Sequence, residues 1–356
     1  ASTLGAAEFY VSPSGRDGDA GTQAQPFRSL KRARDEVRKL IARGLKSNVT
    51  VWVAGGLYTL SDPLVLGLAD SGSNRFSVTY AAAPGEEPVL SGGVKIEGWK
   101  ELDSTPDELQ VPARGKVWVA DVPAPLGRFY SLYDAHGHLP RARCDGFIPA
   151  DPPTPDPEDR FKITDVHNLY FPAGALRNWD NLDDAELVVR PSIKWTMNIL
   201  ALRSVDESAR VARTKLPATY PLRKIPRTTY KTAWVENVME GLDQPGEWVL
   251  NTHTRKLYLW PRGDKPEGIL APGLRELIRI EGKVDVKGPA DTPVKNVILR
   301  GLTFAHADRD LWVEGDTGIQ HDWEMVDKAN ALVRLRGTEN CAVEQCRFRD
   351  SGGNAI

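Results

Sequence analysis

The sequence predicts a mainly β fold, in which a solenoid of stacked strands has one helix at its amino end and an antiparallel β segment inserted into it. Short alternating strands recur between Gly and Pro turns, with no helices between them. One amphipathic helix stands near the amino end, and the strand pattern changes between residues 97 and 270. A solenoid coil buries its apolar face only against the next coil, so such a fold requires this recurrence.

The helix is predicted between Pro26 and Gly44, after a strand at residues 9–11 and a turn rich in Gly, Asp and Ser. Its apolar positions have helical spacing and the charged residues occupy the other face. These positions are Leu30, Ala33, Val37, Leu40 and Ile41. We expect the helix to cover the open end of the first coil as a cap. Asp17 and Asp19 lack the Gly and terminal Glu of a calcium loop, so they are interpreted as turn residues.

Residues 1–96 are assigned to the cap and the first coils of the solenoid. Val49, Val51 and Val53 alternate with Thr50, Trp52 and Ala54, which is the period of a strand with one buried face.

Residues 97–270 are predicted to form an inserted antiparallel domain resembling a β-sandwich. Two apolar runs, 248–250 and 257–260, flank a short polar connection and predict a hairpin. Five prolines within residues 149–160 exclude a helix or a central strand and predict a stiff, exposed excursion.

Residues 271–356 return to the solenoid pattern, with period two around Val297, Leu299, Leu332 and Arg334. The distance between these two strand regions is too long for one plain coil, so a loop is expected between them. The pattern stops within a coil at Ile356, which would leave an open edge. We therefore expect the β-helix to continue beyond this residue.

The composition restricts the class of protein. Of 356 residues, 41% are hydrophobic and 26% charged, with a net charge of −2, which is typical of a soluble globular chain. Charges of both signs are interspersed, so neither nucleic acid nor an anionic membrane is an expected partner. No apolar run reaches the ~20 residues that span a bilayer. Cys144, Cys341 and Cys346 form neither a disulfide framework nor a zinc pattern.

Four segments carry a resemblance to a known family. They are "FYVSPSGRDGDAGTQAQPFRSLKRARDEVR", "YAAAPGEEPVLSGGVKIEGW", "EWVLNTHTRKLYLWPRG" and "VKNVILRGLTFAHAD". They resemble the opening part of right-handed parallel β-helix proteins that act on polysaccharides, and among these glycoside hydrolase family 141 most closely. The resemblance extends over nearly the whole chain. It implies a right-handed β-helix, a secreted or periplasmic protein, and a catalytic acid pair on the coils. It implies α-L-fucosidase or xylanase as activities known in the family.

The candidate catalytic residues lie in the stretch "GIQHDWEMVDKANALVRL". Glycosidic hydrolysis by the usual route needs two carboxyl groups, one to donate a proton and one to attack or to activate water. Asp322 and Glu324 are two residues apart and would point to one side of an extended segment. His321 is a candidate acid or base because its ordinary pKa is near neutral. The alternative is a solvated loop of mixed charge.

The candidate substrate-binding residues are aromatic or charged residues on the same returning coils. Trp312 and Trp323 could stack on sugar rings, although core packing is the alternative for both. Asp308, Asp310 and Arg334 could bind sugar hydroxyls or an acidic group.

Further polar clusters have simpler interpretations. Arg334, Arg336, Arg347 and Arg349 could form a basic strip across two strands, or could pair with neighbouring acids. His136 and His138 form an H-x-H pair without a third ligand at a recognised spacing, so no metal is expected. Asp350 is interpreted as a turn carboxylate. The acids of 236–247 are interpreted as turn, packing or surface residues.

We therefore expect a glycoside hydrolase that cleaves a plant or algal polysaccharide or oligosaccharide by paired-carboxylate chemistry. No phosphate loop, nucleophile elbow or dinucleotide fingerprint is present in the sequence, so no cofactor is expected. A polysaccharide lyase and a non-catalytic glycan-binding β-helix remain alternatives, because one scaffold supports many chemistries.

Overall fold

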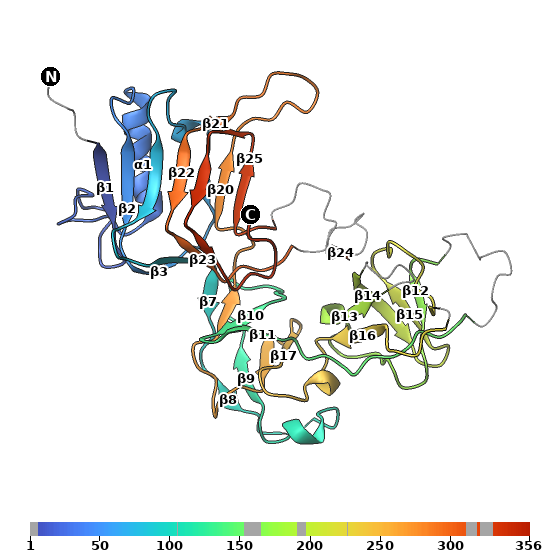
Figure 1. The fold of residues 1–356 in the computed structure, drawn as a ribbon. Helices are drawn as coiled ribbons and strands as arrows, with labels where there is room; N and C mark the ends of the chain where they lie inside the picture. The colour runs from blue at the N-terminus through green and yellow to red at the C-terminus, as the bar shows by residue number, and fades with distance from the viewer. Residues whose placement is uncertain are drawn as a thin grey trace.

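The computed structural model describes residues 6–104, 106–152, 165–190, 197–225, 227–310, 319–320 and 330–356. The fold is mainly β, as the sequence predicts, with one α-helix and four short 3-10 helices among the described residues. Figure 1 shows a group of upright strands beside the helix and, below it, a second group of shorter sheets. Within the described residues, no helix is both long and apolar enough to cross a membrane.

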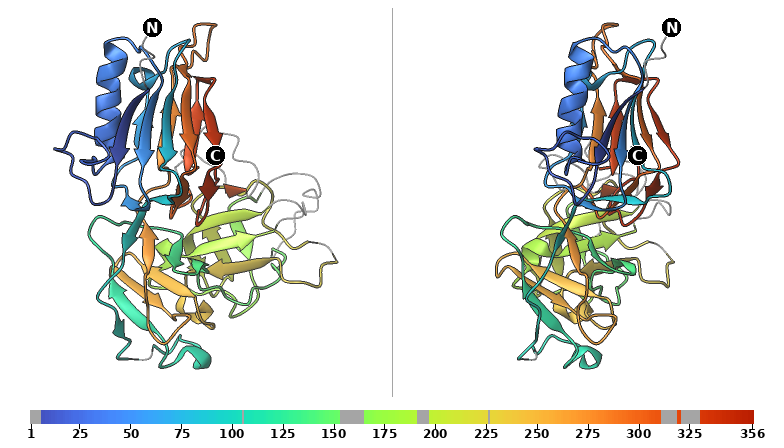
Figure 2. Two further views of the ribbon diagram at one scale, coloured as in Figure 1. Left: turned by 60° about the vertical axis from the view of Figure 1, so that its left-hand side comes forward. Right: turned by 90° about the vertical axis from the view of Figure 1, so that its left-hand side faces the viewer.

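The helix α1 spans Leu30–Ala42 and confirms the predicted amphipathic segment. The side chain of Ser29 accepts a hydrogen bond from the amide of Arg32 at 3.1 Å and so caps the first turn. Its buried residues Leu30, Ala33 and Val37 belong to the same core as the first parallel strands. Two views place the helix along the flank of these strands (Figure 2).

Three parallel sheets and one additional parallel strand pair form the part of the molecule that we call the parallel body. The five-strand sheet has the order β1 (Ala7–Val11), β2 (Val49–Val53), β5 (Val78–Ala82), β22 (Val297–Arg300) and β27 (Ala342–Glu344). The four-strand parallel sheet contains β3 (Gly56–Thr59), β6 (Pro88–Ser91), β23 (Thr303–Ala305) and β28 (Arg347–Phe348). The three-strand sheet contains β4 (Leu64–Leu66), β20 (Ile278–Glu281) and β25 (Val333–Arg336), and β21 (Val294–Lys295) pairs with β26 (Thr338–Glu339).

The chain visits these sheets in a repeating order. It passes through β4, β5 and β6, later through β20, β22 and β23, and finally through β25, β27 and β28. Every neighbouring pair in these sheets is parallel and in register, for example Val51 with Tyr80 and Tyr80 with Leu299. The inward residues of all three sheets form one continuous apolar core, because each pass buries its alternate side chains against the next.

The segment between β6 and β20 forms three sheets of antiparallel pairs, which we call the antiparallel part. The first contains β7 (Gly93–Lys95), β10 (Leu132–Asp134), β11 (Gly137–Leu139) and β19 (Leu270–Pro272). The second contains β8 (Lys100–Glu101), β9 (Trp118–Asp121), β17 (Trp248–Asn251) and β18 (Lys256–Leu259). The predicted hairpin is confirmed, since β17 and β18 pair antiparallel.

The third sheet of the antiparallel part has six strands. They are β12 (Asn168–Tyr170), β15 (Val211–Thr214), β14 (Asn198–Asp206), β13 (Glu186–Val189) and β16 (Ala233–Glu236), with β24 (Ile319–Gln320) paired to β14. One face of this sheet packs on its own apolar cluster, which includes Leu187, Val189, Leu200 and Val235. The opposite face is therefore free to contribute to a site.

Candidate functional site

A cleft of about 770 Å³ lies where the antiparallel part meets the parallel body. Its lining comes from segments far apart in the sequence, including Tyr130, Arg141, Glu186, Glu236, Arg309 and Gly352. Clefts between structural units are common places for ligands, because side chains from different elements converge there. This cleft is the candidate functional site.

Strand alternation supplies one wall of the cleft. In β13, Leu187 and Val189 point into the apolar cluster, so Glu186 points to the other face. In β16, Ala233 and Val235 are in the same cluster, so Glu236 points away from it.

The pairing register then brings these two acids together. Glu186 stands directly opposite Glu236 in the antiparallel pair of β13 and β16. Opposite residues of such a pair have Cβ atoms roughly 4.5–5.5 Å apart, so the two carboxyl groups share one small region of the wall.

Two arginines compensate the charge of Glu186, which is almost fully buried. Arg141 forms an ion pair with Oε2 of Glu186, and Nη2 of Arg309 donates to Oε1 at 2.5 Å and to Oε2 at 2.6 Å. Nη1 of Arg141 also lies 3.9 Å from Oε2 of Glu236. A buried carboxylate needs such partners, because charge taken out of water is costly unless it is paired and hydrogen-bonded.

Glu236 is the more accessible member of the pair. Its side chain is 25% exposed, against 3% for Glu186. The indole nitrogen of Trp234 donates to Oε1 of Glu236 at 2.8 Å and fixes the orientation of the carboxyl group. The guanidinium of Arg143 stacks over the same indole, 4.9 Å from the ring centroid.

The ring of Tyr130 packs against the guanidinium groups of Arg309 and Arg141. The guanidinium of Arg309 lies 3.6 Å from the centroid of the Tyr130 ring, and that of Arg141 lies 5.4 Å away. Burial, together with the charge of Glu186, raises the pKa of the Tyr130 hydroxyl to about 12. The phenol therefore stays neutral, and its ring serves as a cation-binding surface that orders both guanidinium groups.

Asp308 lies immediately behind this wall. It is buried, and its carboxyl group accepts hydrogen bonds from the amide of Tyr130 at 3.0 and 3.2 Å. Burial raises the pKa of Asp308 to about 6, although Arg309 and the hydrogen bonds oppose this change. The protonation state of the Asp308 carboxyl group therefore affects the hydrogen bonds that hold the backbone of Tyr130.

Histidines stand on the side of the cleft nearest the parallel body. Nδ1 of His306 and Oγ of Ser91 are 2.8 Å apart, and Nε2 of His306 lies 3.7 Å from Oδ2 of Asp350. The ring of Tyr133 packs edge-on against His306 and also against His138, which lines the cleft. Desolvation lowers the pKa of both histidines, against the opposing charge of Asp350. Neutral imidazoles are favoured in this region.

The two contacts that link Ser91 to His306 and His306 to Asp350 have the residue types of a nucleophilic triad, but not its function. Ser91 is 1% exposed, and its hydroxyl accepts a hydrogen bond from the amide of Gly93. A nucleophile must reach its substrate, so this contact is interpreted as a structural link between β6 and the turn after β23.

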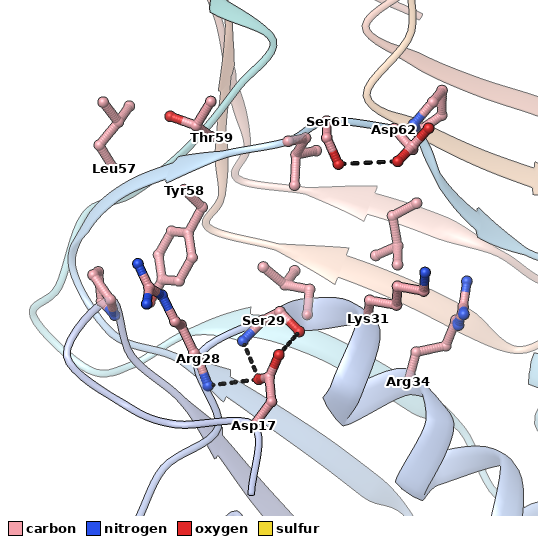
Figure 3. A pocket seen from close by; sticks show the side chains of 15 residues that line it. Asp17, Arg28, Ser29, Lys31, Arg34, Leu57, Tyr58, Thr59, Ser61 and Asp62 are labelled. Atoms are coloured by element: carbon pink, nitrogen blue, oxygen red, sulfur yellow. Dashed lines mark hydrogen bonds between the residues drawn. The ribbon is translucent and has the colours of Figure 1, made fainter.

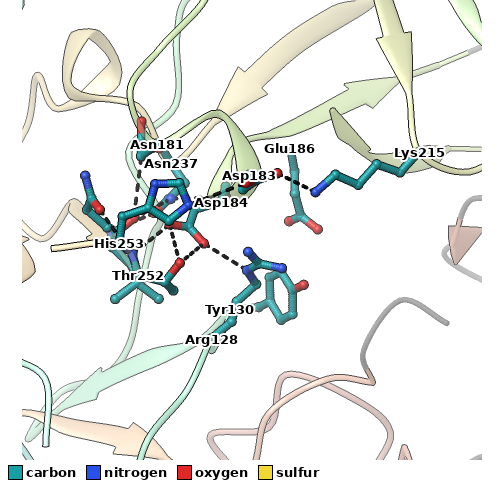
Figure 4. A network of polar contacts seen from close by, with 12 residues as sticks. Arg128, Tyr130, Asn181, Asp183, Asp184, Glu186, Lys215, Asn237, Thr252 and His253 are labelled. Carbon is teal, nitrogen blue, oxygen red and sulfur yellow. Dashed lines mark hydrogen bonds and ion pairs between the residues drawn. The ribbon is translucent and has the colours of Figure 1, made fainter. Parts of the chain in front are cut away.

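A network around Asp184 fixes the position of the cleft wall (Figure 4). Asp184 precedes β13 at the end of the 3-10 helix η3 (Leu182–Asp184). Its carboxyl group accepts from Arg128 at 2.9 Å and from the amide and hydroxyl of Thr252, at 2.7 and 2.8 Å. Its carbonyl accepts from Arg141 at 3.2 Å. This network joins the β17–β18 hairpin to the strand that carries Glu186.

Of the predicted site residues, Trp312, His321, Asp322, Trp323 and Glu324 lie outside the described residues. The strand that precedes four of them, β24, pairs with β14 through Ile319 and Ile199, and Ile199 lines the cleft.

The other three predicted site residues are described and do not share one surface. Asp308 lies behind the cleft wall. Asp310 is buried, forms an ion pair with Arg275, and its amide donates to Asn330 at 2.8 Å. Arg334 stands on β25, with Nη1 at 3.9 Å from Glu276.

The arginine strip considered from the sequence does not form. Arg334 and Arg336 stand on the three-strand sheet, whereas Arg347 belongs to the four-strand parallel sheet and Arg349 follows it. Three of the arginines pair with acids of neighbouring coils, and Arg349 pairs with the adjacent Asp350. In the described residues, no group of three or more His, Cys, Asp and Glu side chains has the arrangement of a metal site.

Sequence reasoning did not identify Glu186, and it interpreted Glu236 as a turn, packing or surface residue. One signal for Glu186 was available, because an acid that begins the apolar run "ELVV" is a candidate for burial beside a paired charge. The pairing of β13 with β16, which makes the two acids neighbours, was not readable from either segment alone.

A second large cavity, of about 690 Å³, lies beside the start of α1 (Figure 3). Asp17 accepts hydrogen bonds there from the amides of Arg28 and Ser29, at 3.0 and 2.8 Å, and from the hydroxyl of Ser29. This confirms the turn role predicted for Asp17. Asp17 and Ser29 are engaged in capping the helix and its preceding turn. The other lining carboxylate, Asp62, accepts from the adjacent Ser61, so this cavity is a weaker candidate for chemistry.

Comparison with known proteins identifies a shared fold. No protein-family profile and no curated protein matches the sequence. A solved structure described as "Glycoside hydrolase" superimposes with a TM-score of 0.74 at 22% identity, over 98% of this chain. The chain spans 62% of the length of that structure. Another, described as "The complex structure of XylC with xylose", has a TM-score of 0.34 and 16% identity, over 84% of this chain and 35% of its own.

Proposed function

We propose that this chain is part of a glycoside hydrolase and that the cleft between the parallel body and the antiparallel part binds the sugar. The observation that carries the proposal is the opposed pair Glu186 and Glu236 in a cleft of about 770 Å³. The shared fold with a structure described as a glycoside hydrolase supports it.

Glu236 is the carboxyl group that we assign to proton transfer. It is the accessible member of the pair, and the indole of Trp234 holds one of its oxygens in place. Catalytic acids and bases must lie within hydrogen-bond reach of the reacting oxygen, which requires access to the cleft. Glu186 is too enclosed for this role.

Glu186 is a positioning residue in this proposal. It fixes the guanidinium groups of Arg141 and Arg309, and both groups line the cleft. Their positive charge would attract the oxygen lone pairs of sugar hydroxyls at this edge of the cleft. A guanidinium held by a carboxylate and an aromatic ring loses little freedom when a sugar binds.

The second carboxylate is proposed to come from Asp322 or Glu324, with His321 as an additional acid or base and Trp312 and Trp323 as stacking surfaces. Support comes from the strand before most of these residues, because β24 pairs with β14 next to Ile199 of the cleft wall. Asp308, Asp310 and Arg334 are proposed to support the site rather than to bind sugar.

We propose further that the three parallel sheets are faces of a right-handed parallel β-helix interrupted at residues 97–270. The repeated order in which the chain visits the sheets supports this arrangement. Connections between parallel strands of one sheet are right-handed in about 98% of cases. Action on a plant or algal polysaccharide also implies export, so we propose a secreted or periplasmic protein.

Reducing-sugar release tests the proposal on a panel of fucosylated, xylan and pectic polysaccharides. The Glu236→Gln variant is expected to lose about 100-fold or more of the turnover rate, because it cannot exchange a proton at that position. Glu344→Gln, an exposed acid in the parallel body, is the matched control and should keep full activity.

Three results would contradict the hydrolase proposal. The first is that the unmodified protein releases no reducing sugar from any polysaccharide of the panel, and the second is that Glu236→Gln keeps full turnover. A product that absorbs in the ultraviolet would instead assign the lyase mechanism, because elimination leaves a double bond in the sugar.

A further inference from the structure

A separate pocket of about 290 Å³ lies in the antiparallel part, between the loop before η3 and the β17–β18 hairpin. Trp179, Met239 and Tyr258 supply its apolar lining. The segment from Glu236 to Glu240 contributes to both cavities, because Glu236 lines the cleft and Glu240 lines this pocket. Neither the fold comparison nor the proposed catalysis gives this pocket a role.

We propose that this pocket is a second carbohydrate-binding site, which holds one neutral pyranose ring of the polymer while the cleft acts on another. Sugar binding at this pocket stands on the geometry of the pocket itself, and its joint action with the cleft rests on the proposed hydrolase function.

Trp179 provides a preformed stacking surface. Its indole nitrogen donates to both carboxyl oxygens of Glu240 at 2.9 Å, which fixes the ring. Part of the ring packs against the apolar cluster of the six-strand sheet, and the residue remains partly exposed in the pocket. The apolar face of a sugar ring packs on such an aromatic face, and an ordered ring loses little side-chain freedom on binding.

Tyr258 adds a second aromatic residue on the hairpin side. It is partly buried against the cluster that contains Leu242 and Val249, and it also lines the pocket. An aromatic surface with a few convergent polar groups is the usual composition of a small-ligand site.

The polar lining favours a neutral sugar over an acidic one. Among the described lining residues, four carboxylates stand against one guanidinium, that of Arg177, which lies 3.5 Å from Glu240. The four are Glu108, Asp180, Glu207 and Glu240. Carboxylates accept hydrogen bonds from sugar hydroxyls but repel a uronate or a sulfate.

The size of the pocket sets the length of the ligand. At about 290 Å³ it lies at the lower limit of the roughly 300–1,000 Å³ found for small-molecule sites. It therefore fits one ring, whereas the cleft of about 770 Å³ has space for more. Two sites on one polymer raise the effective concentration of the substrate at the cleft.

Titration calorimetry with the methyl glycosides of L-fucose, D-xylose and D-galactose tests the proposal, with glucuronate as the acidic comparison. At least one neutral glycoside should bind with a dissociation constant on the order of 1 mM, and glucuronate should bind far more weakly. Trp179→Ala should weaken that binding about 10-fold or more, and Trp179→Phe by less, because it keeps a ring but loses the bond to Glu240.

Trp99→Ala is the matched control. Trp99 is another partly buried Trp of the antiparallel part, with its indole nitrogen bonded to the carbonyl of Ile96, and it lines neither cavity. It should leave the dissociation constant unchanged, and circular dichroism would verify that each variant is folded.

The proposal is overturned if no neutral glycoside binds, if Trp179→Phe and Trp179→Ala both bind as tightly as the unmodified protein, or if glucuronate binds best. Its failure is separable from failure of the hydrolase assignment. Glu236→Gln should abolish hydrolysis while it leaves glycoside binding at the pocket intact, and Trp179→Ala should slow turnover of polymer but not of a short soluble glycoside.

Discussion

Exposed ion pairs of the parallel body and the buried ion pairs of the cleft wall use charge in opposite ways. In the parallel body, Arg300 and Glu344 are register partners on β22 and β27 and pair at 2.8 Å, with side chains 47% and 42% exposed. In the cleft, Glu186 is enclosed and two arginines converge on it. Exposed pairs contribute little to stability, whereas buried pairs cannot lose one member without penalty. Buried charges that converge and also line a cleft therefore mark the site, whereas exposed charges that follow the coils do not.

The largest expected effect comes from removing the central charge of the cleft wall. Glu186→Gln should lower the free energy of unfolding by about 3–5 kcal/mol, because Arg141 and Arg309 would then face each other without the carboxylate that they share. Urea denaturation monitored by fluorescence measures this difference.

Glu236→Gln on the opposite strand is the matched control for stability. It is more exposed, so its loss should cost less than about 1 kcal/mol while hydrolysis is lost. Equal destabilisation by both variants would contradict the distinction between a positioning residue and a reacting residue.

The next effect concerns Asp308 and depends on pH. Burial raises its pKa to about 6, above the ordinary value of about 3.9, so the folded protein binds the proton more tightly than the unfolded chain. The contribution of Asp308 to stability is therefore full below about pH 4 and decreases as pH rises through 6. A change of about two pKa units corresponds to about 3 kcal/mol.

Comparison with Asp308→Asn isolates this contribution. The unmodified protein should lose about 3 kcal/mol relative to the variant between pH 4 and pH 7, as measured by urea denaturation at each pH. A difference between the two proteins that does not change with pH would show that Asp308 titrates normally in the folded state.

A buried acid also exists in the parallel body and sharpens the comparison. Asp70 is fully buried, accepts two hydrogen bonds from Arg38 at 2.8 and 2.7 Å, and accepts a third from the amide of Gly67. Asp70→Asn should cost about 2 kcal/mol, since hydrogen bonds to charged groups contribute about 1.5–3 kcal/mol. It should leave hydrolysis unchanged, because Asp70 joins α1 to the first coil and does not line the candidate cleft. Loss of turnover with intact folding would contradict this separation.

The sequence predicted the fold better than the site, for a physical reason. Strand periodicity, the amphipathic helix at Leu30–Ala42 and the β17–β18 hairpin are local patterns, so they were readable and are confirmed. The order in which the chain visits the three parallel sheets depends on pairings such as Tyr80 with Leu299, which join residues more than two hundred positions apart. Local patterns do not determine such pairings.

The site follows the same rule. Asp308 was identified from its segment, but its enclosure by the backbone of Tyr130 was not predictable, because that contact joins the two parts of the molecule. Glu186 and Glu236 become neighbours only through the register of β13 and β16. His321, Asp322 and Glu324 stay predictions, and activity measurements on Asp322→Asn and Glu324→Gln will decide between them.

The smallest expected effect comes from the exposed pairs of the parallel body. Glu344→Gln removes the partner of Arg300, but both side chains are nearly half exposed, so water and salt already screen their attraction. The expected cost is about 0.2–1 kcal/mol, and it should shrink further at about 1 M salt, where the Debye length falls to about 3 Å. The cost of Glu186→Gln should hardly depend on salt, because no solvent separates its carboxylate from the guanidinium groups. If both variants respond to salt alike in urea denaturation, burial does not distinguish the two regions and the assignment of the cleft by its converging charges fails.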